Sequence, residues 1–373
     1  MYKNLTIVSD TAIFLEDGKY YAFGPVVNEL ESFEPLFDEI VWIGFNRPDK
    51  KGDLSMKAIA SEKVSVILLK EVGGKTLFSS LNILFRYPEM FFVILKNAFK
   101  ADVIHTRAPS HPAFIAVLIS FLIRNKIWWN KFAGSWDSST LPFFYRVQKN
   151  ILLKAKHTKV TINGFWENQP KHCLSFENPC LSNEDIKKGK TIADTKSFQP
   201  PFTFCFVGRL EAAKGIDRII EALKSIPLDT IEKVHLIGDG PGKEAYQNAA
   251  GFLGDKVVFH GFLNKDNVHA LLSESHFLLL PSNSEGFPKA IAEGACYGVI
   301  PVASNVGSIG HYITEENGFL WDINSDNPYG LVLNKAIQTD ELRLKEMSVT
   351  VLELAEKFTF DNYIDQLKRQ LFN

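Results

Sequence analysis

Residues 278–303, LLLPSNSEGFPKAIAEGACYGVIPVA, carry the clearest structural signal in this chain. The apolar run Phe277–Leu280 overlaps their start and suits a buried β-strand. Turn residues follow, and a helical pattern then runs over residues 289–297 until Gly298 ends it and a second apolar run begins. The stretch therefore predicts a strand, a loop, a helix and a second strand, which is the repeating unit of a parallel α/β sheet.

Two carboxylates in this stretch, Glu285 and Glu293, are eight residues apart. That spacing predicts that they lie about two turns apart on the same face of the helix. The free N–H groups of a first helical turn carry partial positive charge, so a polyol or phosphate ligand would accept bonds from Gly286 and Phe287 and donate hydroxyls to the glutamates. On spacing alone, a capped helix with two solvated glutamates explains the pattern equally well.

Two cations border a second loop, which links an expected strand at residues 202–208 to an expected helix at residues 216–226. Arg209 can grip two oxygens in a fork, and Lys214 acts as a point charge beside a glycine. This arrangement at a helix start suits a diphosphate. The alternative is a pair of exposed cations at a helix edge.

The composition limits the class of protein. A chain of 373 residues predicts two or three domains, and 46% hydrophobic with 23% charged residues is ordinary for a soluble globular protein. No apolar run reaches the ~18 residues that span a bilayer, and the first residues do not read as a signal peptide. We therefore expect a cytoplasmic protein with reduced thiols and no zinc site or disulfide frame, because no C-x2-C pair occurs. The four cysteines are Cys173, Cys180, Cys205 and Cys296.

Charge is distributed unevenly along the chain. Residues 1–198 contain 26 Lys and Arg against 20 Asp and Glu, whereas the rest carries a net charge of −8. Such an asymmetry predicts that the first half faces an anionic partner. Residues 75–100 mix aromatic, apolar and basic side chains, which fits either a core helix or a helix at a membrane surface.

Residues 285–293, EGFPKAIAE, resemble the E-x7-E signature of the retaining glycosyltransferases of family 4. Three further segments resemble this family: GRLEAAKG at 208–215, GDGP at 238–241 and VVFHG at 257–261. The resemblance implies the GT-B architecture, an α/β fold of two Rossmann-like domains that face each other across a cleft. It also implies a C-terminal helix that crosses back to the first domain.

The resemblance assigns roles to the second half of the chain. Glu285, Arg209 and Lys214 are implied as the catalytic group, with the two cations stabilising the departing diphosphate. No cofactor or metal is expected, because the nucleotide-sugar is a co-substrate and no DxD stands at a strand end. The residues implied to bind the donor are Glu293, which would hold the ribose, and Gly286, Phe287, Pro288, Gly208, Gly238 and Phe262.

The first half departs from the family pattern. Ala133 stands where many relatives carry a histidine that approaches the reacting sugar, and the usual Gly-Gly pair is missing from the loop expected after residues 4–9. The acceptor would be bound by side chains near the ends of the predicted strands. These candidates are Asp10, His105, His111, Trp136 and Asp137.

We accordingly expect an acceptor domain at residues 1–182 with a tail at about 358–373, a linker at 183–200 and a nucleotide-sugar domain at 201–357. The implied reaction moves a sugar, with retention and without a metal, from a UDP- or GDP-sugar to a glycan. A lipid-linked intermediate of surface polysaccharide biosynthesis at the inner membrane face is the expected acceptor, and nucleic acid is not an expected partner. The alternatives are a two-domain sugar-nucleotide epimerase and a non-catalytic nucleotide-sugar-binding protein.

Overall fold

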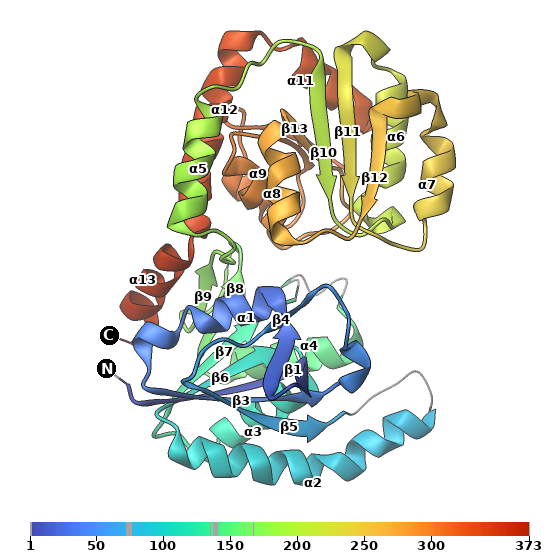
Figure 1. The fold of residues 1–373 in the computed structure, drawn as a ribbon. Coiled ribbons are helices and arrows are strands. Elements are labelled where there is room, and N and C mark those ends of the chain that lie inside the picture. Colours follow the sequence, from blue (N-terminus) through green and yellow to red (C-terminus); the bar gives the residue numbers. More distant parts are fainter. Residues whose placement is uncertain (1, 72–76, 135, 137–140, 167, 373) are drawn as a thin grey trace. The chain divides into compact units, whose positions relative to one another are not determined.

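The computed structural model describes residues 2–71, 77–134, 136, 141–166 and 168–372, with only the backbone for residues 77–84. The chain divides into two compact units. The first contains Met1–Phe176 together with Ile364–Asn373, and the second contains Glu177–Tyr363. Both are built on a mainly parallel sheet, so the prediction of two Rossmann-like domains is confirmed (Figure 1).

The sheet of the first unit has nine strands in the described residues. β1 pairs in parallel with β3 on one side and β6 on the other, and the sheet continues from β3 to β5 and from β6 through β7 and β8 to β9. The strands are β1 (Asn4–Glu16), β2 (Lys19–Phe23), β3 (Glu39–Asn46), β4 (Met56–Ala58), β5 (Val64–Lys70), β6 (Val103–Ala108), β7 (Ile127–Phe132), β8 (Lys159–Asn163) and β9 (Cys173–Phe176).

β1 is longer than the strand predicted at residues 4–9. It shifts register between Val8 and Ala12 and then turns back into β2 as an antiparallel hairpin. Both residues of the turn, Asp17 and Gly18, have positive φ, which is the geometry that Asp-Gly favours in a two-residue hairpin. Asp10 therefore lies in a bulge inside a strand, and the ligand loop predicted there is wrong.

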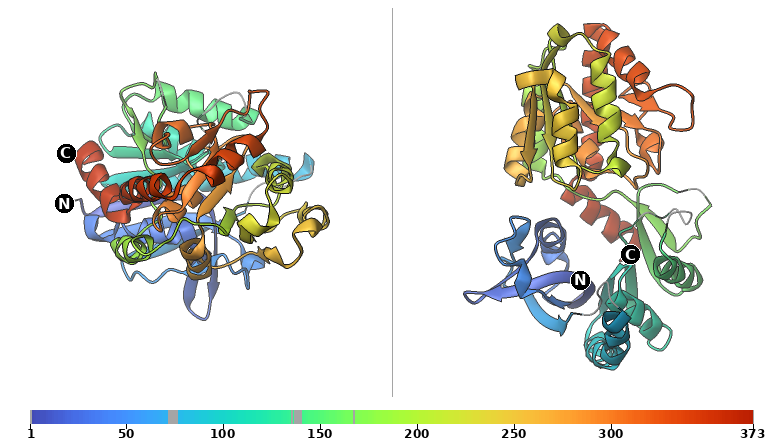
Figure 2. Two further views of the ribbon diagram at one scale, coloured as in Figure 1. Left: turned by 90° about the horizontal axis from the view of Figure 1, so that it is seen from above. Right: turned by 90° about the vertical axis from the view of Figure 1, so that its right-hand side faces the viewer.

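Helices connect the parallel strands of the first unit (Figure 2). α2 continues through Pro88, and Ser110 caps α3 by accepting a hydrogen bond from Ala113 N. The helices are α1 (Gly24–Glu31), α2 (Leu77–Lys100), α3 (His111–Ser120) and α4 (Phe143–Lys154), with short 3-10 helices η1 (Glu34–Leu36) and η2 (Pro48–Lys50). None of the helices in the described part of the chain combines the length and the hydropathy needed to cross a bilayer.

The second unit has a six-stranded parallel sheet in the order β12-β11-β10-β13-β14-β15. This is the strand order of a dinucleotide-binding fold, in which the chain winds outward from β10 in one direction and then from β13 in the other. The strands are β10 (Phe202–Val207), β11 (Ile231–Ile237), β12 (Val257–Gly261), β13 (Phe277–Leu280), β14 (Ile300–Ser304) and β15 (Phe319–Trp321).

Helices and short 3-10 turns complete the second unit. The helices are α5 (Asn183–Ala193), α6 (Ile216–Lys224), α7 (Lys243–Ala249), α8 (Lys265–Glu274), α9 (Lys289–Ala295), α10 (Ile309–Tyr312), α11 (Tyr329–Gln338) and α12 (Glu341–Ala355). The 3-10 helices are η3 (Ala212–Lys214), η4 (Leu228–Thr230), η5 (Gly251–Lys256) and η6 (Glu356–Phe358).

The last helix, α13 (Phe360–Leu371), begins in the second unit and ends in the first. The ring of Phe372, just after it, lies 5.9 Å from the ring of Phe37 and 6.2 Å from that of Trp129. The predicted return of the C-terminal helix to the first domain is therefore confirmed.

Most of the segment predicted to be a linker, residues 183–200, is helical. Ser182 and Asp185 form a reciprocal capping box at the start of α5. The helix packs on the second unit through Gly189, where an added Cβ would lie 1.9 Å from the carbonyl oxygen of Cys296. Ile186 and Ile192, which are partly buried, also pack against the core of the second unit, three residues to either side of Gly189.

We predict that Gly189→Ala destabilises the second unit by about 1–3 kcal/mol, because the methyl group must displace a backbone carbonyl. This loss should outweigh the helix preference of alanine, which favours it by roughly 1 kcal/mol. Urea unfolding measures the change. Lys188→Ala, at an exposed site on the same helix, is the control and should leave stability nearly unchanged; equal stability of both variants would contradict the packing described.

Candidate active site

The loops that follow β10 and β13 form the centre of the candidate site. The two strands are adjacent, with Phe204 opposite Phe277 and Cys205 opposite Leu278. Because the chain leaves these strands toward opposite sides of the sheet, a crevice forms outside their carboxyl ends, where doubly wound folds bind ligands. Residues 208–215 and 281–288 occupy this position, and they contain the cations and the first glutamate singled out from the sequence.

The loop after β10 is locked to the loop after β11. Gly208 N donates to Ile237 O at 3.0 Å, and Leu210 N donates to Asp239 O at 3.0 Å. Gly238 has a φ of 131° and an added Cβ would lie 1.8 Å from Gly208 O, so only glycine fits. Gly208 and Gly238 thus give the loop its shape.

The loop after β13 is attached to the loop after β10 and to α6. Asn283 N donates to Ala213 O at 2.9 Å, and the guanidinium of Arg218 donates to Pro281 O at 2.8 Å. Arg218 also lies 5.2 Å from the centre of the Trp321 ring. The sequence analysis missed this positioning arginine, whose only signal is its place in the first turn of the helix after GRLEAAKG.

Lys214 and Glu285 meet between the two loops. Lys214 Nζ donates to Glu285 Oε1 at 2.5 Å, and the side chains are 27% and 10% exposed. The predicted diphosphate cation and the predicted sugar-binding carboxylate are therefore in direct contact. Lysine has three donors, so Nζ retains the capacity to bind an additional oxygen.

Arg209 lies in a different environment. Its side chain is 71% exposed, and its Nε is 3.4 Å from Glu211 Oε2. A long ion pair at this exposure holds the guanidinium weakly. Arg209 is thus free to reorient toward a ligand.

Glu285 lies in the loop and not on the helix. α9 begins at Lys289, so the prediction that Glu285 and Glu293 share one helical face is wrong. Pro288 occupies the N-cap position and ends the extended loop. The helix begins where the pattern of residues 289–297 predicts, so Glu285 lies four residues before its first residue.

The loop around Gly286 is held from its other side by Ser308, which the sequence analysis did not select. Ser308 donates to Gly286 O from its backbone N at 2.9 Å and from Oγ at 2.7 Å. Within the described residues, the N–H groups of Gly286 and Phe287 have no hydrogen-bond acceptor. Two adjacent backbone N–H groups that have no acceptor can both donate to an anionic oxygen of a ligand.

The Phe287 side chain anchors this loop. Its ring is 6% exposed and stacks on Phe358, with centroids 4.6 Å apart and planes inclined by 15°. The Tyr312 ring contacts it at 4.7 Å. Any contribution of Phe287 to ligand binding must therefore come from its backbone.

Glu293 lies in α9, half-buried. Within the described residues it makes no hydrogen bond or ion pair. Burial raises the pKa of its carboxyl above the usual range, although Lys289 and Lys265 oppose the shift. A ligand hydroxyl donating to this carboxylate would supply the missing partner.

Phe262 lies beside the two loops that Gly208 and Gly238 hold together. It follows Gly261, whose carbonyl oxygen accepts from Gly238 N at 2.8 Å. The Phe262 side chain is 50% exposed. An exposed aromatic ring beside these glycine-containing loops can stack on a flat group of a ligand.

In the first unit, His105 is a structural residue, so the prediction that it contacts an acceptor is wrong. It lies inside β6 with 0% exposure, and its ring centre is 3.8 Å from that of Trp129. Burial lowers the pKa of this imidazole well below its usual value. His111 is partly exposed, but its Nδ1 is 2.8 Å from Tyr87 Oη and its ring stacks on Phe144 at 4.5 Å.

The remaining candidates in the first unit differ in accessibility. Trp136 is 6% exposed and packs against Phe132 at 5.1 Å, with the Lys149 ammonium 4.8 Å from its ring centre. Its ring is covered by protein, so the predicted stacking on a sugar is wrong. Asp10 is exposed, and Asp137 lies outside the described residues.

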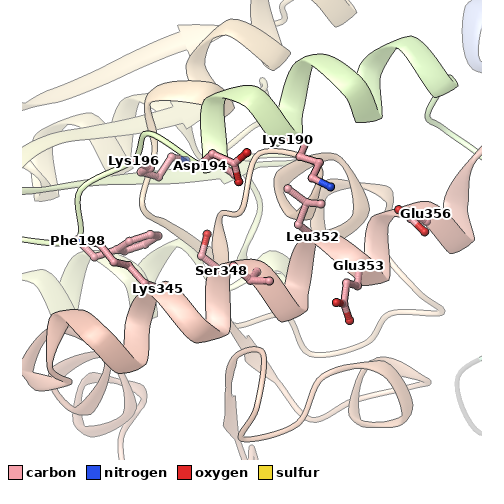
Figure 3. A pocket seen from close by; sticks show the side chains of 11 residues that line it. Lys190, Asp194, Lys196, Phe198, Lys345, Ser348, Leu352, Glu353 and Glu356 are labelled. Atoms are coloured by element: carbon pink, nitrogen blue, oxygen red, sulfur yellow. The ribbon is translucent and has the colours of Figure 1, made fainter.

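A cavity of about 600 Å³ lies elsewhere in the second unit, between α5 and α12 (Figure 3). It shares no residue with the loops at the carboxyl ends of β10 and β13. Lys196 in its lining donates to Ser275 O at 2.6 Å and to Tyr297 O at 2.9 Å, and burial lowers its pKa to about 7. These contacts identify Lys196 as a structural lysine.

The second unit is thus a Rossmann-like unit in which Lys214 and Glu285 are in contact beyond the carboxyl ends of β10 and β13. Residues 187–346 match the family model "Glycosyl transferases group 1". The match lies within the second unit and covers less than half of the chain.

Curated relatives resemble parts of the chain. An uncharacterized glycosyltransferase of Methanocaldococcus jannaschii is 29% identical over 164 residues, which are 43% of this chain and 44% of that protein. D-rhamnosyltransferase WbpZ of Pseudomonas aeruginosa is 34% identical over 30% of this chain and 29% of its own length. Sulfoquinovosyl transferase SQD2 of Arabidopsis thaliana is 31% identical over 60% of this chain and 47% of its own length. The chain thus spans less than half the length of these relatives.

Solved structures resemble the whole chain in fold. Sucrose-phosphate synthase from Thermosynechococcus elongatus is 16% identical with a TM-score of 0.69, and 99% of each chain is covered. Anabaena HepE in complex with UDP-glucose is 17% identical with a TM-score of 0.70, and 100% of each chain is covered.

We predict that Gly238→Ala is more destabilising than Gly254→Ala. Both glycines have positive φ, so each alanine incurs strain of about 1–3 kcal/mol. Gly238→Ala adds a clash with Gly208 O worth roughly another 1–3 kcal/mol, whereas nothing lies within 4 Å of a Cβ at Gly254. Urea unfolding compares them, and equal losses would mean that the two loops are not locked together.

Proposed function

We propose that this protein is a retaining glycosyltransferase that moves a sugar from a UDP- or GDP-sugar to a glycan acceptor. The observation that carries the proposal is the contact between Lys214 and Glu285 in the crevice outside β10 and β13. This crevice lies within the segment that matches the glycosyl transferases group 1 family.

The residues around the crevice suggest how the donor binds. Glu293 would accept the ribose hydroxyls, because its half-buried carboxylate lacks a protein partner. Phe262 would stack on the base, and the N–H groups of Gly286 and Phe287 would donate to phosphate oxygen. Glu285 would accept from a hydroxyl of the donor sugar while Lys214 Nζ bridges that carboxylate and the diphosphate.

The reaction requires that charge be stabilised on the leaving group. The bond between the anomeric carbon and the diphosphate oxygen breaks, and the acceptor oxygen forms its new bond on the same face of the sugar. The departing phosphate oxygen takes the proton of the acceptor hydroxyl, so no protein nucleophile is needed. Lys214 and Arg209 act on the negative charge that develops at the diphosphate, where fixed cations are most effective.

For the acceptor we propose a lipid-linked glycan of surface polysaccharide assembly, used at the inner face of a membrane. Residues 1–198 have a net charge of +6, which suits an anionic lipid carrier. The similarity to D-rhamnosyltransferase WbpZ supports the transfer of a sugar.

One assay separates the proposal from an epimerase and from a non-catalytic binder. The protein is incubated with a panel of UDP- and GDP-sugars, with and without acceptor. Nucleotide release that depends on the acceptor supports a transferase, and an altered sugar in the recovered donor indicates an epimerase. Binding without turnover across the panel contradicts a catalytic role.

We predict that Lys214→Ala and Arg209→Ala each lower kcat by about 10²–10³, because each removes a charge that acts on the leaving group in the transition state. KM for the donor should rise less than kcat falls. Steady-state kinetics with a saturating acceptor measures both constants. Lys224→Ala, which removes an exposed cation paired with Glu221 on α6, is the matched control; near-normal turnover in both site variants would remove the diphosphate assignment.

We also predict that transfer survives EDTA. The basis is that Lys214 and Arg209 supply the positive charge that a divalent ion would otherwise bring to the diphosphate. Initial rates are compared in EDTA and in magnesium after exhaustive dialysis. If EDTA abolishes turnover and magnesium restores it, the reaction is metal-dependent.

A further inference from the structure

The solvent-facing side of α2 is apolar where a surface helix is normally polar. Phe85, Phe92 and Phe99 are 81%, 66% and 62% exposed. They are seven residues apart, so they align along the helix with a drift of only about 20° per step. At about 100° per residue, Ile94 lies on the opposite side from Phe85 and is fully buried against the sheet.

The exposed side of α3 extends this surface. α2 and α3 pack against each other on the same face of the sheet (Figure 1). Leu118 and Leu122, four residues apart at the end of α3, are 43% and 72% exposed. We call the five residues the phenylalanine surface, namely Phe85, Phe92, Phe99, Leu118 and Leu122.

Cations lie beside the phenylalanine surface. Lys96 lies about 40° and Lys100 about 80° around the helix from the middle of the phenylalanine row, and both are exposed. Within the described residues, neither ammonium group has a carboxylate partner. Arg124 and Lys126 follow Leu122 at the end of α3, and the one carboxylate on this side of α2, Glu89, is paired with Arg86 at 3.0 Å.

We propose that the phenylalanine surface docks on an anionic lipid bilayer. Aromatic side chains are favoured at the boundary between headgroups and acyl chains, and lysines beside them gain from anionic lipids. A second copy of the chain is a poorer occupant, because symmetric pairing through this surface would place the same unpaired cations against each other. This inference rests on the proposed lipid-linked acceptor, and it names the face that brings the first unit to the bilayer.

The structure also corrects which residues make this surface. Residues 75–100 contain other aromatic side chains, but Phe91 is partly buried against the core of the first unit. Phe78 and Lys75 lie outside the described side chains. The proposal therefore depends on three phenylalanines and two lysines of α2 and on the end of α3.

Sedimentation with phosphatidylcholine vesicles, with and without phosphatidylglycerol, tests the proposal on the full chain. Wild type should pellet with anionic vesicles at low salt and be partly released at high salt. Phe85→Ser/Phe92→Ser/Phe99→Ser should lower partitioning about tenfold or more on both vesicles. Lys96→Gln/Lys100→Gln should lower it on the order of tenfold on anionic vesicles alone.

The matched controls are exposed residues of the second unit. Leu331→Ser/Leu342→Ser removes two exposed leucines, and Lys187→Gln/Lys188→Gln removes two exposed lysines. Both should bind vesicles like wild type, and circular dichroism with a thermal melt should show that every variant is folded. Because the altered phenylalanines are exposed, their replacement should not lower the melting temperature.

Several results would overturn the docking face. The first is that wild type does not pellet with any vesicle, and the second is that the serine triple variant pellets like wild type. The third is that wild type is a dimer in analytical ultracentrifugation whereas the triple variant is a monomer. Transfer to a soluble acceptor separates this inference from the proposed function. The triple variant should retain that transfer, whereas absent transfer with intact vesicle binding would contradict the proposed function alone.

Discussion

The reversal of strand order between β10 and β13 is the constraint on which the candidate site depends. Adjacent parallel strands whose connections leave toward opposite faces cannot fill the space outside their carboxyl ends. The loops after them border this space, and backbone hydrogen bonds hold each loop in place: Leu210 to Asp239, Asn283 to Ala213 and Ser308 to Gly286. The Lys214–Glu285 ion pair is a product of this framework. The pair is also balanced electrostatically, because the carboxylate of Glu285 neutralises the ammonium group of Lys214.

Much of the second unit could be predicted from sequence because its signals are local. Short apolar runs marked the strands, and the motifs at 208–215 and 285–293 each lie on one loop next to one strand. The wrong or missed predictions concern features that depend on contacts between residues distant in sequence. The 285–293 spacing fits a helical period although Glu285 lies in the loop before α9, and α5 was overlooked because its sequence is mostly polar and contains a glycine. Arg218 and Ser308 became visible only when the structure placed Pro281 and Gly286 beside them.

The first unit was harder to predict, since burial is a property of the whole fold. His105 was expected at the end of a strand but lies inside β6, and the structure encloses both its ring and that of Trp136. The Asp17-Gly18 pair is a hairpin signal that went unused, and a loop was expected at Asp10 instead. On α2 the composition was informative but ambiguous. Only the direction in which each side chain points separates the buried Ile94 from the exposed Phe92.

The closeness of Gly238 to Gly208 also bears on how such a protein can diversify. A site in which one added carbon would meet a carbonyl oxygen at 1.8 Å has almost no freedom to change its backbone. Variation in ligand preference must then come from side chains at the rim, such as Phe262, which is half exposed. A library built to alter the ligand preference of this site should therefore vary exposed side chains such as Phe262 and keep Gly208 and Gly238.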